Sequence, residues 1–200
     1  AYSTVDGKNY GVPFDNGAVI GAYRTDILEQ AGYTTADLTD IDWNRFIEIG
    51  KDVKAKTGTY MLSGQADSPD TIMMMLQSAG ASLFDEDGKP AMTDNDALKE
   101  CIDIYKTMVD EGIYLEVNKW DDYVTSITKG SVAGVINGNW IIATIQGMED
   151  TAGKWEITNM PKLIKTPNAT NYSNNGGSSW YIASNCKNKD LAIDFLKSTF

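Results

Sequence analysis

A tryptophan flanked by amide side chains is the strongest candidate for chemistry in this sequence. Trp140 ends the run Val135-Ile136-Asn137-Gly138-Asn139-Trp140, where an apolar strand pattern meets the start of a helix pattern. Backbone amides are unpaired in the first turn of a helix, and Asn side chains both donate and accept hydrogen bonds. An aromatic face beside such groups suits a sugar ring. A Trp in a first helical turn is also often a core residue, and the residues alone support the two interpretations equally.

The side chains that most enzymes need are missing. The chain of 200 residues has no His and only two Cys, Cys101 and Cys186. Without His, the usual general base, the commonest zinc ligand and the Ser-His-Asp triad are all excluded. We expect no catalytic residues and no cofactor, and we interpret Cys101 as a helix core residue rather than a disulfide partner.

One acidic turn resembles part of a calcium loop. It is Asp85-Glu86-Asp87-Gly88, and if Gly88 takes the glycine position of an EF-hand, the first ligand position falls on Leu83. Leucine cannot bind calcium, so we expect no metal and interpret the segment as a solvated hairpin turn.

The charge balance limits the partners. The 17 basic and 28 acidic residues give a formal net charge of −11, which disfavours nucleic acid and anionic lipid and favours neutral or cationic ligands. There is no run of 18 apolar residues that would span a membrane. The start Ala1-Tyr2-Ser3-Thr4 lacks the regions of a signal peptide. If the protein is exported, we expect that its signal lies upstream and that this chain is an excised piece.

Strand and helix patterns alternate along the chain, which predicts an α/β fold with a mixed or mainly parallel sheet flanked by helices. The clearest helix follows the candidate N-caps Asp40 and Asp42 and ends at Gly58, and a second runs from Ala97 to Met108 after a capping box at Thr93. Other helices are expected at 27–31, 71–79, 123–127 and 140–148, and after Asn188 with Leu191, Ala192, Phe195 and Leu196 inside. Strands are expected at 10–14, 18–23, 59–62, 132–136, 155–160 and 180–183, with loops at 63–67 and 165–179.

Five short motifs occur in an order typical of one family. They are residues 10–16 (Tyr-Gly-Val-Pro-Phe-Asp-Asn), 42–46 (Asp-Trp-x-x-Phe), 129–140 (Lys-Gly to Asn-Trp), 176–179 (Gly-Gly-Ser-Ser) and 188–196. Together they resemble the extracellular sugar-binding proteins of ABC transporters, of the maltose-binding-protein type. That resemblance implies two α/β lobes joined by hinge strands, with the ligand in the cleft between them. Residues 1–165 would then form the second lobe and its strand from the hinge, and residues 166–200 the hinge-return segment and a helix that packs towards the first lobe.

The resemblance also implies a set of ligand-binding residues. Trp140 matches the stacking aromatic residue of the second lobe, and Gly177 lies in the hinge-side glycine segment, where backbone approaches ligand. The loop at 63–67 carries an acid and often an aromatic residue in relatives, and the aromatic residue is absent here. Trp180 either stacks on ligand or packs in the core, and we favour the core. The expected ligand-binding residues are Trp140, Asp15, Asn16, Gln65, Asp67, Asn139, Gly177, Ser178 and Trp180.

The resemblance implies a receptor that binds a carbohydrate, an oligosaccharide in particular, and presents it to an ABC permease in the membrane. Such a protein is extracellular or periplasmic, and the full-length form would be lipid-anchored. Two alternatives remain. The charge of −11 suits a receptor of the same fold for a peptide or a cationic solute, and a glycoside hydrolase fragment would need two carboxylates about 5 to 9 Å apart across a cleft.

Overall fold

The computed structural model describes residues 3–199, and the chain divides into two compact units. We call residues 17–175 the long unit and residues 1–16 with 176–200 the split unit. This division differs from the predicted boundary at residue 165, since the first 16 residues group with the last 25. The assignment of either part to a lobe of a larger protein stays a prediction.

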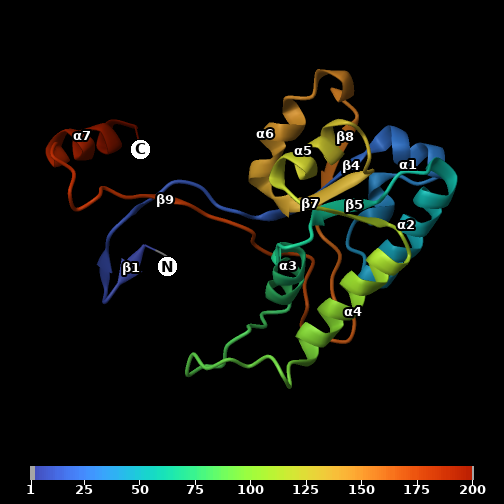
Figure 1. The fold of residues 1–200 in the computed structure, drawn as a ribbon, viewed down its shortest axis with the longest axis horizontal. Helices are drawn as coiled ribbons and strands as arrows, with labels where there is room; N and C mark the ends of the chain where they lie inside the picture. Colours follow the sequence, from blue (N-terminus) through green and yellow to red (C-terminus); the bar gives the residue numbers. More distant parts are fainter. Residues whose placement is uncertain (1–2, 200) are drawn as a thin grey trace. The chain divides into compact units, whose positions relative to one another are not determined.

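A three-stranded antiparallel sheet forms the middle of the long unit (Figure 1). Its central strand is β4 (Val19–Arg24), which pairs with β7 (Gly134–Gly138) on one side and β8 (Trp155–Thr158) on the other. Two further strands, β5 (Leu62–Gln65) and β6 (Tyr114–Val117), pair in parallel. A parallel bridge between Tyr60 and Val132 connects the start of β5 to β7. The predicted α/β class is confirmed, and the strands are mixed rather than mainly parallel.

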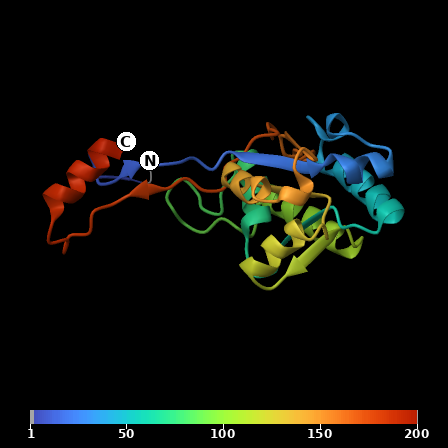
Figure 2. The same ribbon diagram turned by 90° about the horizontal axis from the view of Figure 1, so that it is seen from above.

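Each face of the antiparallel sheet is covered by its own hydrophobic cluster. Successive side chains of a strand point to opposite faces, and accordingly Tyr23 lies in one cluster and Ala22 in the other. The first cluster includes side chains of α1 (Thr25–Ala31), α2 (Trp43–Thr57), α3 (Asp70–Ser78) and α4 (Asp96–Asp110). The second includes side chains of α5 (Trp120–Thr128), the 3-10 turn η2 (Asn139–Ile141) and α6 (Ile142–Gln146). Figure 2 shows β4 running along the unit beside α6.

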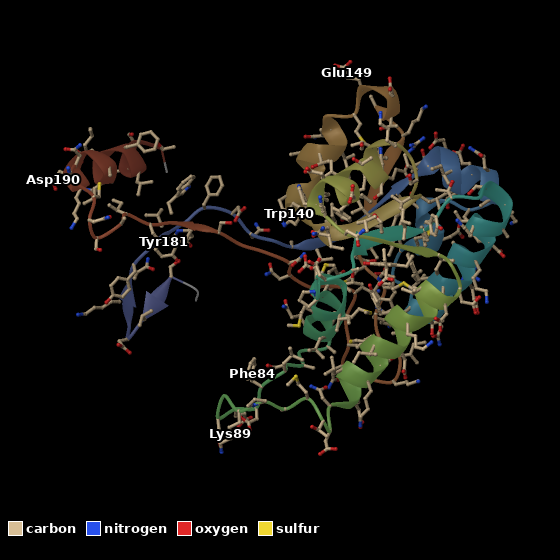
Figure 3. All side chains as sticks on the ribbon, viewed as in Figure 1. Phe84, Lys89, Trp140, Glu149, Tyr181 and Asp190 are labelled. Atoms are coloured by element: carbon tan, nitrogen blue, oxygen red, sulfur yellow. The ribbon has the colours of Figure 1, made fainter. Side chains whose placement is uncertain are left out.

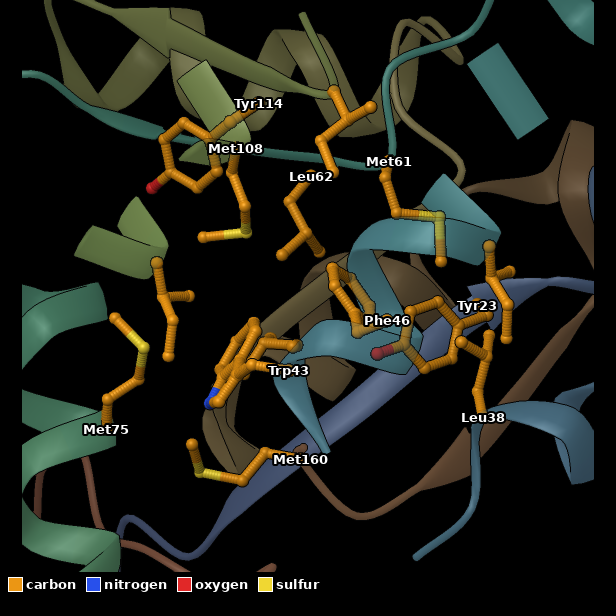
Figure 4. Close-up of a cluster of buried hydrophobic side chains, with 14 of the residues drawn as sticks. Tyr23, Leu38, Trp43, Phe46, Met61, Leu62, Met75, Met108, Tyr114 and Met160 are labelled. Carbon is orange, nitrogen blue, oxygen red and sulfur yellow. The ribbon is translucent and has the colours of Figure 1, made fainter. Parts of the chain in front are cut away.

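Several aromatic and methionine side chains lie together in the first cluster, among aliphatic ones (Figure 4). The rings of Trp43 and Phe46 pack edge to face with centroids 5.3 Å apart, and Tyr23 lies 6.4 Å from Phe46. Cys101 is buried in the same cluster, and both cysteines are free. The prediction that Cys101 is a core residue is therefore confirmed.

The sequence predicted the ends of α2 correctly but the N-cap of α4 incorrectly. Asp42 is the N-cap of α2 and accepts a hydrogen bond from the Arg45 amide, while Gly58 ends the helix with φ +75°. The predicted cap of α4 at Thr93 is wrong, because Asn95 accepts from the Leu98 amide and starts the helix there. Near it, the Asp85 carboxylate accepts from the amides of Asp87 and Lys89 in an exposed turn (Figure 3), as expected.

The strands around β5 depart most from the prediction. The strand expected at 59–62 begins only at Leu62 and continues to Gln65, so most of the expected loop at 63–67 is strand. Strand β6 was not predicted at all. Gly64 is packed so closely against the Tyr114 hydroxyl that an added Cβ would lie 1.8 Å from it. Ser63 and Gly64 in the middle of β5 are small and not apolar, so an apolar pattern does not reveal this strand.

The split unit holds short elements. They are β1 (Thr4–Val5) paired with β2 (Lys8–Asn9), β3 (Val12–Pro13) paired with β9 (Ser179–Trp180), and α7 (Lys189–Thr199). Leu191 and Phe195 were expected inside, but they are 70% and 64% exposed, and α7 buries none of its described residues.

Short 3-10 turns η1 (Thr35–Leu38) and η3 (Glu149–Thr151) complete the long unit. Within residues 3–199, every helix is too short or too polar to cross a membrane.

Candidate functional site

Three strand ends of the long unit lie at one edge. β5 and β6 are parallel, and β7 runs parallel to the start of β5, so their carboxyl ends point the same way. In α/β proteins, ligands bind preferentially beyond the carboxyl ends of such strands. The residues there are Gln65 at the end of β5, Trp120 shortly after β6 and Trp140 shortly after β7. This edge is the candidate site of the long unit.

Trp140 is an exposed ring on a rigid support. It lies in η2, is 37% exposed, and donates a hydrogen bond from Nε1 to the backbone oxygen of Asn175 at 2.9 Å. Gly138 makes this possible, because an added Cβ would lie 2.3 Å from Nε1 and 2.4 Å from that oxygen. The alternative that Trp140 is a core residue is wrong for the described chain. The glycine of the Asn-Gly-Asn-Trp corner is there for close packing.

Asn137 holds this corner together and is buried. Its amide nitrogen donates to the Tyr123 hydroxyl at 3.0 Å, while its oxygen accepts from the Gly138 amide and from the Asn175 side chain. Burial raises the pKa of Tyr123, so the phenol stays protonated. The side chain of Asn137 therefore orders the loop that supports Trp140, in contrast to Asn139, which is only partly buried.

Trp120 is a further candidate site residue, which the sequence patterns did not predict. It is 43% exposed at the first turn of α5. Its ring centroid lies 5.7 Å from that of Trp140, with 45° between the ring planes, and 5.2 Å from that of Tyr123. The alternating run Ile113-Tyr114-Leu115-Glu116-Val117 is a strand signal that would have placed Trp120 after a strand end.

A small pocket opens beside Trp120. It has about 30 Å³ of room, and about 10–15 Å³ is enough to hold one water molecule. Its wall includes the residues Gln65, Asp70, Thr71 and Asn137, and the Thr71 hydroxyl is hydrogen-bonded to the Tyr114 hydroxyl at 2.8 Å. Such a pocket accepts one hydroxyl group rather than a whole sugar ring.

The ligand-binding residues predicted in the long unit differ in their position relative to the pocket. Gln65 lines the pocket and ends a strand rather than lying in a loop. Asn139 precedes Trp140 in η2, and its amide donates to the Ala18 backbone oxygen at 2.8 Å. Asp67 lies exposed in the turn after β5 and is not part of the pocket wall. Gln65 is therefore better placed for a ligand of the long unit than Asp67.

The other predicted residues lie in the split unit, where three of them contact one another. The Asp15 carboxylate accepts a hydrogen bond from the Ser178 amide, and the Phe14 amide donates to the Ser178 oxygen at 2.9 Å. Gly177 has φ +102° and leaves an added Cβ 3.8 Å from the Asp15 oxygen. Asn16 follows on the same exposed segment. Asp15 thus fixes the backbone at Ser178, which accounts for its position without a ligand.

Trp180 is exposed. It lies in β9, is 48% exposed, and packs edge to face on Phe14 with centroids 5.6 Å apart. The favoured prediction that Trp180 is a core residue is therefore wrong for the described chain. Its ring is available to a ligand or to another part of the protein.

The chemistry on offer at these positions is binding. Among residues 3–199, no three His, Cys, Asp or Glu side chains cluster as a metal site would require. What the long unit presents is two aromatic faces beside amide and hydroxyl groups. Apolar faces combined with a few fixed polar groups are typical of small-molecule binding sites.

Known proteins with similar sequences bind solutes outside the cell. Residues 1–200 match the family described as bacterial extracellular solute-binding protein. The lactose-binding protein of Rhizobium radiobacter is 44% identical over 98% of this chain, which covers 46% of that protein. The chain therefore spans about half the length of this relative.

Solved structures agree with these matches. The galacto-N-biose/lacto-N-biose I-binding protein of the ABC transporter from Bifidobacterium longum, in complex with lacto-N-biose, is 26% identical with a TM-score of 0.76, over 97% of this chain and 48% of that one. An ABC-transporter-associated binding protein from B. animalis subsp. lactis, in complex with β-1,6-galactobiose, superposes with a TM-score of 0.81 at 24% identity, over 98% and 48%. The second match shows the fold alone.

Proposed function

Since the chain belongs to the family of bacterial extracellular solute-binding proteins, we propose that it forms part of a receptor that binds a carbohydrate for an ABC import system. The family consists of binding proteins, not enzymes, which removes the support for a glycoside hydrolase. The resemblance first inferred from five ordered motifs is confirmed by this family and by the sugar-binding relatives.

The observation that carries the proposal is the supported ring of Trp140. Its hydrogen bond to the Asn175 oxygen fixes the plane of the indole before any ligand arrives. The face of an aromatic ring is negative, so it attracts the weakly positive C–H groups on one side of a sugar. Because the ring is already held in place, binding costs less conformational entropy.

The ligand class follows from the relatives. The lactose-binding relative is 44% identical, and the Bifidobacterium longum structure holds lacto-N-biose; both ligands are galactose-containing disaccharides. We therefore propose a galactoside disaccharide or a longer oligosaccharide as the ligand. In the full-length protein, the remaining expected contacts would come from Asp15, Asn16, Gln65, Asp67, Asn139, Gly177, Ser178 and Trp180.

The proposed partner is the membrane permease of the same transporter. The proposed location is extracellular or periplasmic, which the match to a bacterial extracellular solute-binding family supports. We propose a lipid anchor for the full-length protein on the basis of the family resemblance.

Replacing Trp140 tests the proposal. We expect Trp140→Ala in the full-length protein to weaken disaccharide binding by about tenfold or more, or about 1.4 kcal/mol, in isothermal titration calorimetry. Phe84→Ala is the control, since Phe84 is an exposed aromatic residue on the loop between α3 and α4 (Figure 3). Unchanged affinity in Trp140→Ala would remove Trp140 from the site.

A ligand screen tests the class. Thermal shift of the full-length protein with disaccharides, oligosaccharides, short peptides and polyamines should show stabilisation by galactosides. Ligands that bind only the native state raise the melting temperature in a concentration-dependent way. Stabilisation by peptides or polyamines alone would favour the alternative that the acidic composition suggests.

A further inference from the structure

Two exposed tryptophans at the candidate site contact each other across different elements. Trp120 follows β6 and Trp140 follows β7, and their centroids lie 5.7 Å apart. Neither ring belongs to a hydrophobic cluster of the long unit. Burying a large aromatic side chain contributes about 1.5–3 kcal/mol, and leaving these two rings 43% and 37% exposed forgoes part of that stabilisation. A ligand that covers both rings accounts for the arrangement.

The angle between the rings limits what that ligand is. Their planes are inclined by 45°, so one flat sugar ring cannot lie parallel to both. Two sugar rings joined by a glycosidic bond can each lie on one indole, because rotation about the bond allows the rings to tilt. The pair therefore suits a ligand of at least two sugar units.

The pocket beside Trp120 adds a polar contact for one of these units. It has room for a hydroxyl group, and Trp120, Gln65 and Asn137 are part of its wall. A sugar lying on Trp120 therefore has its apolar face on the ring and one hydroxyl within reach of amide groups. This combination gives orientation as well as affinity.

We propose that Trp120 is a second stacking residue and that Trp120 and Trp140 together select ligands of two or more sugar units. Trp120 holds the unit whose hydroxyl enters the pocket, and Trp140 holds the next one. The inference rests on the proposed function and extends it, since it adds a residue that determines ligand length.

The test compares affinities for a disaccharide and its component monosaccharides by titration calorimetry with the full-length protein. The probes are lactose, galactose and glucose, or the best disaccharide of the thermal-shift screen with its own components. The wild type should bind the disaccharide at least about tenfold more tightly than either monosaccharide. Trp120→Ala should reduce this ratio to about threefold or less, because each ligand then has one ring to stack on. Each tenfold step equals about 1.4 kcal/mol.

Two further variants test whether Trp120 stacks on the ligand or only packs behind Trp140. Trp120→Phe keeps an aromatic face and should retain most of the ratio, whereas Phe84→Ala should leave it unchanged. If Trp120→Ala weakens all three ligands by the same factor, or changes nothing, Trp120 only packs behind Trp140 and the inference is overturned while the proposed function stands. A wild-type protein that binds no sugar overturns both.

Discussion

The long unit and the split unit treat their aromatic side chains in opposite ways. In the long unit, Trp43, Phe46 and Tyr23 are fully buried, and the exposed rings of Trp120 and Trp140 are anchored by a hydrogen bond or by other rings. In the split unit, Phe14 and Trp180 pack edge to face and both stay exposed, and α7 exposes Leu191, Ile193 and Phe195. Exposure alone therefore does not identify a binding ring.

The difference lies in what holds each ring. Trp140 is exposed, but its Nε1 is bound to Asn175, and Gly138 and Asn137 shape the loop around it. Phe195 is exposed on a helix that buries none of its described residues. We propose that an exposed ring fixed before binding belongs to the site, whereas the exposed apolar side chains of α7 form a surface for another part of the protein to cover. In the proposed full-length receptor, the first lobe would supply that cover.

The largest expected effect comes from replacing a buried Phe of the long unit and an exposed Phe of the split unit and comparing the losses in stability. Phe46→Ala in the 200-residue chain should lower the free energy of unfolding by about 3–5 kcal/mol, because it leaves a cavity among tightly packed rings. Phe195→Ala should change it by less than about 0.5 kcal/mol, as is usual for surface substitutions. Urea denaturation followed by circular dichroism measures both.

Equal losses for the two Phe variants would contradict the difference between the units. In the full-length protein, the same experiment has a second use. A loss for Phe195→Ala that grows well above its value in the 200-residue chain would show that α7 is covered there.

The sequence reveals most where packing follows a simple period. Helices α2 and α4 were predicted because their buried residues recur at helical spacing, and Asp42 caps α2 as expected. The same argument failed for α7, because an apolar period shows which face of a helix would be buried but not what buries it. It also failed at β5, where Ser63 and Gly64 lie in a strand that pairs with β6.

The site shows the same limit. Trp140 was predicted because the residues beside it form a recognisable corner. Trp120 was missed because its contact with Trp140 depends on the parallel alignment of β5, β6 and β7, and no local pattern connects two tryptophans twenty positions apart. The carbonyl that holds Trp140 belongs to Asn175, within a segment predicted only as loop. Tertiary contacts of this kind are invisible to periodicity.

A smaller effect should come from disturbing the hydrogen bond that holds the Trp140 ring in place. Gly138→Ala places a Cβ 2.4 Å from the Asn175 oxygen, so the indole must shift or lose its hydrogen bond. We expect a loss of about 1–3 kcal/mol in stability, as for other overpacked positions, and weaker disaccharide binding in calorimetry. Gly147→Ala is the matched control, since its Cβ would meet its nearest atom at 3.5 Å. Normal binding by Gly138→Ala would mean that the anchoring of Trp140 does not matter.

The smallest expected effect comes from replacing Glu100, whose hydrogen bonds stabilise the long unit. This buried carboxylate accepts hydrogen bonds of 2.8 Å from the amides of Ile164 and Lys165 and from the Thr166 hydroxyl. Burial acts to raise the pKa of Glu100, but these hydrogen bonds outweigh it and the pKa lies below its ordinary value. The ionised form is therefore favoured by folding.

The sign of the pH dependence follows from that shift. The stabilisation is complete above the unfolded-state pKa of about 4.3 and is lost as the pH falls through the lower folded value. Glu100→Gln should cost about 1 kcal/mol at pH 7 and should flatten the fall in stability below about pH 4, measured by urea denaturation from pH 3 to pH 7. Glu86→Gln, in the exposed turn, should leave both unchanged. A steep acid transition that persists in Glu100→Gln would mean that other carboxylates, and not this support, hold the long unit together at low pH.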